Sequence, residues 1–260
     1  MTTNKFTEAA QQFLARRVPG TKAYSLADAI KPTTIEEALV VQQEMIKLRS
    51  DSVAGWKCLL PLAEDKIIIA PIFSETIQKG EQCSLMKDKG KARLEPEIAF
   101  VLSKDLPARD GDYSDAEIND AIGSCHMALE LIQSRFADDS DALFPERLAD
   151  GLVNQGLFIG PEIDKSAAFS ASKVQLSVKQ TETSGKVSEQ NFEGVHPNPL
   201  PQLPIYWAIN FMTKRGTTFK KGEALITGSY AGVVEVDFDK NININYAGMG
   251  CYDVIFKELT

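Results

Sequence analysis

The stretch RLEPEIAFVLSKDL, residues 93–106, decides how this chain is expected to fold. Its five consecutive apolar residues, 98–102, are typical of a buried β-strand. Just before them, Glu95 and Glu97 flank a proline. Residues i and i+2 of a strand share a face, so the two carboxylates would lie side by side at the mouth of a buried segment. Because like charges repel, the pattern predicts that something positive lies between them.

Short apolar or alternating runs, bounded by Gly, Pro and Asp, occur on both sides of this stretch and predict further strands. These runs are GWKCLLPL (55–62), KIIIAPIF (66–73), GLFIGPEI (156–163), VQLSVKQ (174–180), EALITGSYAGVVEVDF (223–238) and GCYDVIF (250–256).

Helical patterns occur mainly near the N-terminus. Apolar spacing predicts a helix over residues 4–17, and a cap at Thr33 or Thr34 predicts another within 31–50. Two further helices are predicted, over 114–125 and within 199–216. The chain is therefore expected to be α+β, with one domain over 1–260: a helical part (1–52) and a strand-rich body (53–260).

Composition excludes some classes of partner. The net charge is −8 and no run of Lys or Arg occurs, which argues against nucleic-acid binding. The N-terminus lacks an apolar segment of signal-peptide length, and the longest uninterrupted apolar run, 67–73, is far shorter than a membrane span. None of the four cysteines forms a C-x-x-C pair. We therefore expect a cytoplasmic protein with reduced cysteines and no membrane contact.

A third carboxylate, Glu130, lies within the apolar run 127–132. Buried unpaired carboxylates are costly, so the three glutamates predict either ion pairs or a shared cation. A site of three carboxylates without His or Cys suits Mg²⁺ or Mn²⁺. The alternative is that Glu95 and Glu97 lie on a solvated strand end and that Glu130 pairs with Arg135 or another cation.

Three other features are candidates for a site. Lys57 lies among apolar neighbours and is either an anion clamp and proton donor or a lysine whose head reaches solvent. The loop 149–156 carries Asp150, a candidate catalytic residue, yet it also suits an ordinary polar loop. Thr227, Gly228 and Ser229 form either a ligand-binding turn or an ordinary hairpin turn.

Several motifs of other enzyme classes do not occur. His126 and His196 are the only histidines, and neither H-x-H nor H-E-x-x-H is present, so a zinc hydrolase is not expected. No G-x-G-x-x-G, P-loop or G-x-S-x-G occurs either, which leaves nucleotide binding and serine hydrolysis without support.

The chain resembles a known family in the order of its motifs. The stretches that carry the resemblance are GWK near residue 57, EPEIAFVLSKDLP (95–107), ALELIQSR (128–135), GLFIG (156–160), HPNPLPQLPIYWAINFM (196–212) and LITGSYAGVV (225–234). They are similar to those of 2-keto-4-pentenoate hydratases and their relatives, the 4-oxalocrotonate decarboxylases, in the fumarylacetoacetate-hydrolase-like superfamily.

The resemblance implies a strand-rich mixed-sheet roll preceded by helices, a homo-oligomer, and roles for specific residues. Glu95, Glu97 and Glu130 would hold the divalent metal, and Lys57 would be the active-site lysine. The turn 227–229 would help to hold the substrate carboxylate.

Two segments depart from the family pattern. The stretch PLAEDKIIIAPIF is shorter than usual, and residues 150–156 read DGLVNQG where DNASxG is commoner.

The implied substrate is a short 2-oxo or 2-hydroxydienoic acid. The first hypothesis is hydration of a 2-hydroxy-2,4-dienoate to a 4-hydroxy-2-oxo acid in aromatic meta-cleavage catabolism. A 4-oxalocrotonate-type decarboxylase, an acylpyruvate C–C hydrolase and a non-catalytic partner subunit remain as alternatives. Hydration is favoured over decarboxylation because no second cation lies within the apolar strand segments; Arg109 or Arg147 would be the first suspects for one.

Overall fold

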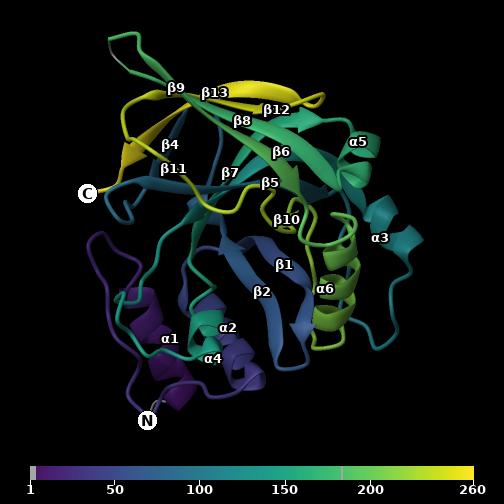
Figure 1. Ribbon diagram of the computed structural model, residues 1–260. Coiled ribbons are helices and arrows are strands. Elements are labelled where there is room, and N and C mark those ends of the chain that lie inside the picture. Colours follow the sequence, from purple (N-terminus) through teal and green to yellow (C-terminus); the bar gives the residue numbers. More distant parts are fainter. Residues whose placement is uncertain (1–3, 183) are drawn as a thin grey trace.

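The computed structural model describes residues 4–182 and 184–260, and within them two β-sheets form the centre of the molecule (Figure 1). The larger sheet has eight strands, seven of them in one row. In spatial order these are β2 (Lys66–Phe73), β1 (Val53–Ala63), β10 (Ala224–Ile226), β5 (Ala92–Leu102), β6 (Ile122–Ile132), β7 (Asn154–Ile163) and β3 (Ile77–Gln78), and β11 (Val234–Val236) also pairs with β5.

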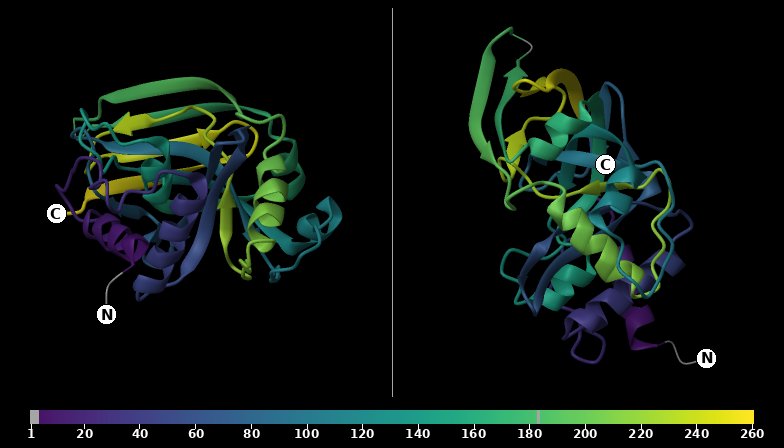
Figure 2. Two further views of the ribbon diagram at one scale, coloured as in Figure 1. Left: turned by 90° about the horizontal axis from the view of Figure 1, so that it is seen from below. Right: turned by 90° about the vertical axis from the view of Figure 1, so that its right-hand side faces the viewer.

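The smaller sheet has five strands and lies at the end of the molecule opposite the N-terminal helices (Figures 1 and 2). In spatial order its strands are β4 (Gln82–Leu85), β13 (Gly250–Glu258), β12 (Asn241–Tyr246), β8 (Lys173–Thr181) and β9 (Val187–Val195). Tyr246 of β12 ties this sheet to the larger one. Its fully buried hydroxyl lies 3.0 Å from the carbonyl oxygens of Glu97 and Ala128.

Most of the helices pack on strands of the larger sheet. The helices are α1 (Lys5–Ala15), α2 (Ile35–Leu48), α3 (Asp115–Ala121), α4 (Phe144–Ala149), α5 (Lys165–Ser170) and α6 (Leu203–Thr213), with a short 3-10 helix, η1 (Ser74–Thr76). α1 packs on α2, which in turn packs on α4 and β2, while α6 packs on β1. Because α4 comes from the middle of the chain, this packing supports the hypothesis of a single domain, which stays a prediction. No helix among the described residues is long and apolar enough to cross a membrane.

The predicted α+β fold is confirmed, except that one helix was predicted to be longer than it is. α1, α2 and α6 lie inside their predicted ranges, and Thr34 and Ser114 both serve as N-caps. The helix predicted over 114–125 ends at Ala121, because residues 122–125 belong to β6. Cys125 and its neighbours pair there with β5 and β7. Tertiary pairing thus overrides a pattern that is compatible with either structure.

The segment 223–238 is not the hairpin that its two apolar runs suggest. β10 pairs with β5 at residues 99–101 and β11 pairs with β5 at residues 92–94, so both lie along one edge of the same strand. The intervening residues 227–233 run past β5 where Glu95 and Glu97 occur, and the backbone N–H of Tyr230 donates to the carbonyl oxygen of Pro96 at 3.0 Å. The segment between β10 and β11 therefore lies against β5 at the position of the two carboxylates.

One buried carboxylate should make the stability of this fold depend on pH. Glu223 is 5% exposed and accepts a hydrogen bond from Nε1 of Trp56 at 2.9 Å. Burial raises the pKa of Glu223 to about 7. A pKa raised in the folded state stabilises the fold below the unfolded-state pKa, and this contribution is lost as the pH rises towards 7.

Glutamine cannot ionise. We therefore expect Glu223→Gln to have the same free energy of unfolding as the wild type at pH 4.5, and a free energy of unfolding up to about 3 kcal/mol higher at pH 8. Urea unfolding of both proteins across this pH range measures the difference. Glu117→Gln is the control, and its difference from the wild type should change with pH in the opposite direction. The reason is that hydrogen bonds from Arg109 and Ser114 lower the pKa of Glu117 to about 2. A difference for Glu223→Gln that does not change with pH would contradict the prediction.

Candidate metal centre and active site

Two adjacent strands of the larger sheet bring the three predicted carboxylates together. Glu95 and Glu97 lie on one face of β5, and Glu130 of β6 is paired directly opposite Glu95. One oxygen from each of the three carboxylates lies within 4.8 Å of the others. The two residues that the i, i+2 rule placed on one face are therefore joined by a third residue from the neighbouring strand.

These carboxylates lie largely away from solvent and repel one another. Glu97 and Glu130 are 2% and 1% exposed, and Glu95 is half-buried. Burial, together with the charge of Glu130, raises the pKa of Glu95 to about 7. The same two causes and the charge of Glu95 raise the pKa of Glu97 well above its usual range. A cation among the three oxygens would remove this repulsion.

Lys57 is the cation that contacts this cluster. It lies on β1 and its Nζ is 2.6 Å from Oε1 of Glu130 and 3.2 Å from the carbonyl oxygen of Leu152. Burial alone would lower the pKa of Lys57, but the charges of Glu130 and Glu95 outweigh it and raise the pKa. The alternative of a lysine with a solvated head is wrong for this structure, because the head is 12% exposed and faces the carboxylates.

The charges of this cluster leave room for one divalent ion. Three carboxylates and one ammonium group have a net charge of −2 when all are ionised. A hard divalent cation prefers carboxylate oxygens and would balance that charge. The donor set and its unbalanced buried charge therefore fit a divalent metal. The alternative that Glu130 pairs with Arg135 or another cation is confirmed in its second part, because Arg135 contacts Asp150 whereas Glu130 pairs with Lys57.

Glu130 is also contacted from a strained turn between α4 and β7. Gly151, Leu152 and Val153 all have positive φ, at 91°, 52° and 65°. Such angles are rare for residues with side chains, so the surrounding structure must hold the turn. The turn presents the carbonyl of Leu152 to Lys57, and Nδ2 of Asn154 donates to Oε1 of Glu130 at 2.9 Å.

Asp150 begins this turn but does not reach the metal centre. Its carboxylate is 1% exposed and accepts hydrogen bonds from Nε of Arg135 at 2.8 and 2.9 Å. Arg17 donates to its carbonyl oxygen as well. This placement corrects the prediction of a catalytic Asp150, because a buried carboxylate held by arginine supports the turn and does not face the cavity. The sequence could not reveal this, since the contacts arise only in the folded chain.

The turn 227–229 contributes a backbone contact to the cluster, and its role in holding a substrate carboxylate stays a prediction. The backbone N–H of Gly228 donates to Oε2 of Glu97 at 2.6 Å, so it orients one carboxylate of the cluster. Gly228 has φ 119°, and a Cβ there would lie 2.5 Å from Cγ of Pro197, so only glycine fits. Thr227 is fully buried and its hydroxyl lies 3.3 Å from Nε2 of His196. Of the three predicted residues, Gly228 and Ser229 line the cavity described next.

A cavity of about 310 Å³ opens beside the three carboxylates. One end is charged and carries Lys57 with the glutamates, while the rest is mainly apolar. The apolar wall, as we call it below, consists of Leu59, Ile68, Leu152, Pro197 and Ile226. Sequence reasoning missed this wall, which is assembled from four separate segments of the chain.

The two arginines that were the first suspects for a second cation do not line the cavity. Arg109 pairs with Glu117 on the surface, and Arg147 binds backbone carbonyls of the segment before α4. Among the described residues, Lys57 is the only lysine or arginine that lines the cavity.

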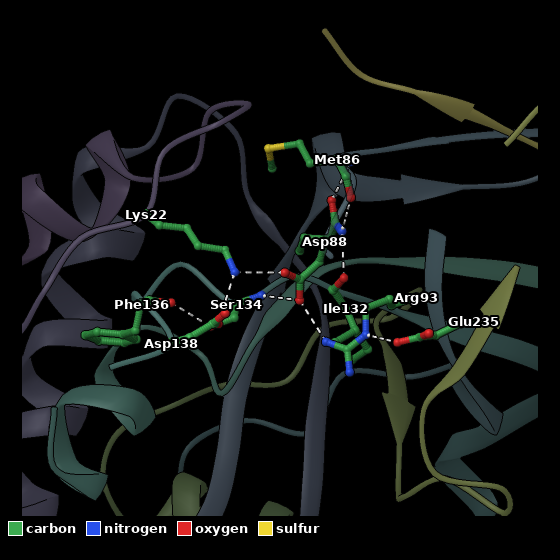
Figure 3. A network of polar contacts seen from close by, with 10 residues as sticks. Lys22, Met86, Asp88, Arg93, Ile132, Ser134, Phe136, Asp138 and Glu235 are labelled. Carbon is green, nitrogen blue, oxygen red and sulfur yellow. Dashed lines mark hydrogen bonds and ion pairs between the residues drawn. The ribbon is translucent and has the colours of Figure 1, made fainter. Parts of the chain in front are cut away.

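Arg93 belongs to a network of polar contacts behind the metal strands (Figure 3). Its Nη1 donates to Oδ2 of buried Asp88 at 2.7 Å, and its Nε contacts Glu235. Asp88 also accepts from the backbone N–H of Ser134 at 3.1 Å and pairs with Lys22. Figure 3 shows Lys22 and Arg93 converging on Asp88, so Asp88 and Glu235 are the direct partners of Arg93.

Comparison with known proteins agrees with this geometry. No family model matches the chain. The chain is 26% identical to a 2-hydroxyhexa-2,4-dienoate hydratase of Comamonas testosteroni, with 99% of this chain and 100% of the relative covered. It is 25% identical to a TodF product hydratase of Pseudomonas putida, with 94% of this chain and 88% of that protein covered.

Solved structures show the same fold. A 4-oxalocrotonate decarboxylase of Pseudomonas putida, complexed with magnesium and adipate, matches with a TM-score of 0.73 at 18% identity, over 99% of both chains. A fumarylacetoacetate hydrolase family protein of Yersinia pestis matches with a TM-score of 0.52 over 81% of this chain. The chain is thus similar in sequence to hydratases of 2-hydroxydienoates and of 2-keto-4-pentenoate, and it shares its fold with the 4-oxalocrotonate decarboxylase and the fumarylacetoacetate hydrolase family protein.

Proposed function

We propose that the protein is a divalent-metal-dependent hydratase that adds water to a short 2-hydroxy-2,4-dienoate and forms a 4-hydroxy-2-oxo acid. The observation that carries this proposal is a cavity with one lysine and three carboxylates at one end and the apolar wall at the other. The names of the sequence relatives, which are dienoate and pentenoate hydratases, support the same reaction and a place in aromatic meta-cleavage catabolism.

Glu95, Glu97 and Glu130 would hold Mg²⁺ or Mn²⁺, which as a Lewis acid would stabilise negative charge on the C2 oxygen of the substrate. Gly228 and Asn154 keep two of these carboxylates in place through hydrogen bonds of 2.6 and 2.9 Å. The protein thus fixes the ligands before the substrate arrives, which reduces the cost of reorganisation during the reaction.

Lys57 is placed to donate a proton to the substrate. An ammonium group has three N–H donors, and two are directed at Glu130 and Leu152. The third remains for a substrate oxygen in the cavity. Because neighbouring carboxylates raise its pKa, Lys57 is protonated at neutral pH and acts first as a donor and a stabilising charge.

The apolar wall favours a monocarboxylate whose tail is a short hydrocarbon chain. A 4-oxalocrotonate-type decarboxylase must hold a second carboxylate at the far end of its substrate. Burying that charge against Leu59, Pro197 and Ile226 without a cation would be costly. Decarboxylation is the second candidate, since the matched decarboxylase shares the fold over its whole length.

Two remaining alternatives receive less support. An acylpyruvate hydrolase of the kind considered above would use a histidine base, whereas His196 contacts Thr227 and His126 lies 3.0 Å from the hydroxyl of Ser124. A non-catalytic partner would not need three clustered carboxylates with a buried lysine. We further propose a cytoplasmic homo-oligomer, on the strength of the family resemblance.

Substrate comparison tests the proposed reaction. With Mg²⁺ present, we expect kcat/KM for 2-hydroxypenta-2,4-dienoate to exceed that for 4-oxalocrotonate at least about tenfold, because the apolar wall offers no partner to the second carboxylate. Loss of the dienol absorbance and release of CO₂ are measured side by side. A preference for the dicarboxylate with CO₂ release would assign the decarboxylase reaction instead.

A further inference from the structure

A second cavity lies behind the metal centre and has a different character. Its volume is about 270 Å³, and Leu131 of β6 lines it. Since Leu131 follows Glu130 in the strand, the two side chains point to opposite faces of the sheet, so this cavity is separate from the one that holds the carboxylates. Three arginines line it, and we call it the arginine cavity: Arg17, Arg49 and Arg135 with Glu75, Thr76, Gln78, Ser84, Met86, Leu131, Gln155 and Leu259.

Two of these arginines are buried and share one carboxylate. Arg135 is fully buried and binds Asp150 through Nε, while Nη2 of Arg17 lies 3.9 Å from Oδ1 of the same residue. The side chain of Arg17 is 12% exposed. Among the described residues, Nη1 of Arg135 and Nε of Arg17 are buried and have no hydrogen-bond partner.

The charge around these two side chains is not balanced. Asp150 neutralises one of the two guanidinium groups. Arg49, the third arginine, already pairs with Asp51 and with Glu75, whose side chain is 68% exposed. Burial, followed by the charge of Arg135, lowers the pKa of Arg17 to about 9. A buried, unbalanced guanidinium with a free donor is costly unless an anion joins it.

We propose that the arginine cavity binds one small oxyanion, a carboxylate or a phosphate, between Arg17 and Arg135. Guanidinium groups bind both oxyanions through paired N–H donors, and the free nitrogens supply one donor from each arginine. Ser84 lines the same space, and its hydroxyl can add a further contact. A volume of about 270 Å³ holds such an anion with some water.

The bound anion would also act on the strained turn that supports the metal centre. Arg17 donates to the carbonyl oxygens of Asp150 and Asn154, and Arg135 donates to that of Asp150. An anion that fixes both guanidinium groups therefore fixes the turn whose Leu152 and Asn154 contact Lys57 and Glu130.

Calorimetric titration tests the site directly. The full-length protein is used without added metal, so that an anion cannot bind through a metal at the three glutamates. Phosphate and acetate are titrated separately, with chloride at matched ionic strength as the reference. We expect saturable one-to-one binding of at least one of the two oxyanions, and the stronger one identifies the class of ligand. Absence of saturable binding by both would overturn the proposal.

Variants locate the binding. Arg17→Met should weaken it at least about tenfold, because it removes a charged donor, and Arg17→Lys should restore part of it. Arg215→Met is the matched control, since Arg215 is exposed just after the end of α6 and does not line the arginine cavity, so the change should not alter the affinity. If Arg17→Met fails to fold, Arg17→Lys, which keeps the charge but loses the paired N–H donors, must by itself weaken binding relative to the wild type. Unchanged affinity in a folded Arg17→Met or, failing that, in Arg17→Lys would refute the site.

Discussion

Replacing Lys57 with methionine should lower kcat by about 10²–10⁴-fold, the loss typical of a removed general acid or electrostatic stabiliser. Methionine keeps most of the apolar stem but removes the three N–H donors. The Nζ that it removes lies 2.6 Å from Glu130 and faces the cavity, so both the proton donor and the balancing charge are lost. Steady-state kinetics with saturating Mg²⁺ measures the effect.

Two controls separate chemistry from folding in this experiment. Thermal unfolding of Lys57→Met with Mg²⁺ should show a folded protein, because a bound divalent ion would still balance the carboxylates. Lys104→Met should leave kcat unchanged, since Lys104 is 58% exposed and pairs with Asp120 on the surface. Wild-type kinetics in a folded Lys57→Met protein would exclude Lys57 from the reacting centre.

Loss of the metal should abolish turnover. A chelator is expected to stop the reaction of the wild type, and added Mg²⁺ or Mn²⁺ should restore it. Glu130→Gln should weaken metal affinity at least about 100-fold, because it removes a charged ligand, whereas changes that only support a ligand typically cost 10–100-fold. The binding of Mn²⁺ by calorimetry measures this loss independently of activity.

The stability of the protein gives a second readout for the same site. Metal at about 100 times its Kd should raise the free energy of unfolding of the wild type by about 2.7 kcal/mol, and that gain should fall to about 0.4 kcal/mol or less in Glu130→Gln at the same concentration. Glu162→Gln serves as the control, because Glu162 is exposed on β7. Full metal binding by Glu130→Gln would contradict the three-carboxylate site.

The metal end of the site could be predicted because it depends on local rules. Alternation within one strand placed Glu95 and Glu97 on one face, and the apolar surroundings of Glu130 marked it as a buried charge that needs a partner. The structure then needed only one cross-strand pairing to complete the cluster.

The rest of the site depends on contacts that no local pattern contains. Asp150 looked like a polar loop residue, but Arg135 and Arg17 meet it only after folding. Asn154 lies in the same loop and gained its role from a hydrogen bond to Glu130 on the neighbouring strand. The segment around Gly228 suggested a hairpin because nothing in the sequence shows that both of its flanks pair with β5.

The origin of the cavity walls affects how such an enzyme can change during evolution. The carboxylates come from two central strands with many backbone partners, whereas the apolar wall comes from the β1–β2 hairpin, the turn before β7, the segment after β9 and the end of β10. Substitutions in the wall can therefore accumulate one at a time without moving the metal ligands. A lineage built on this plan can change the tail of its substrate, or even its reaction, while the ancestral chemistry at the carboxylate end stays intact.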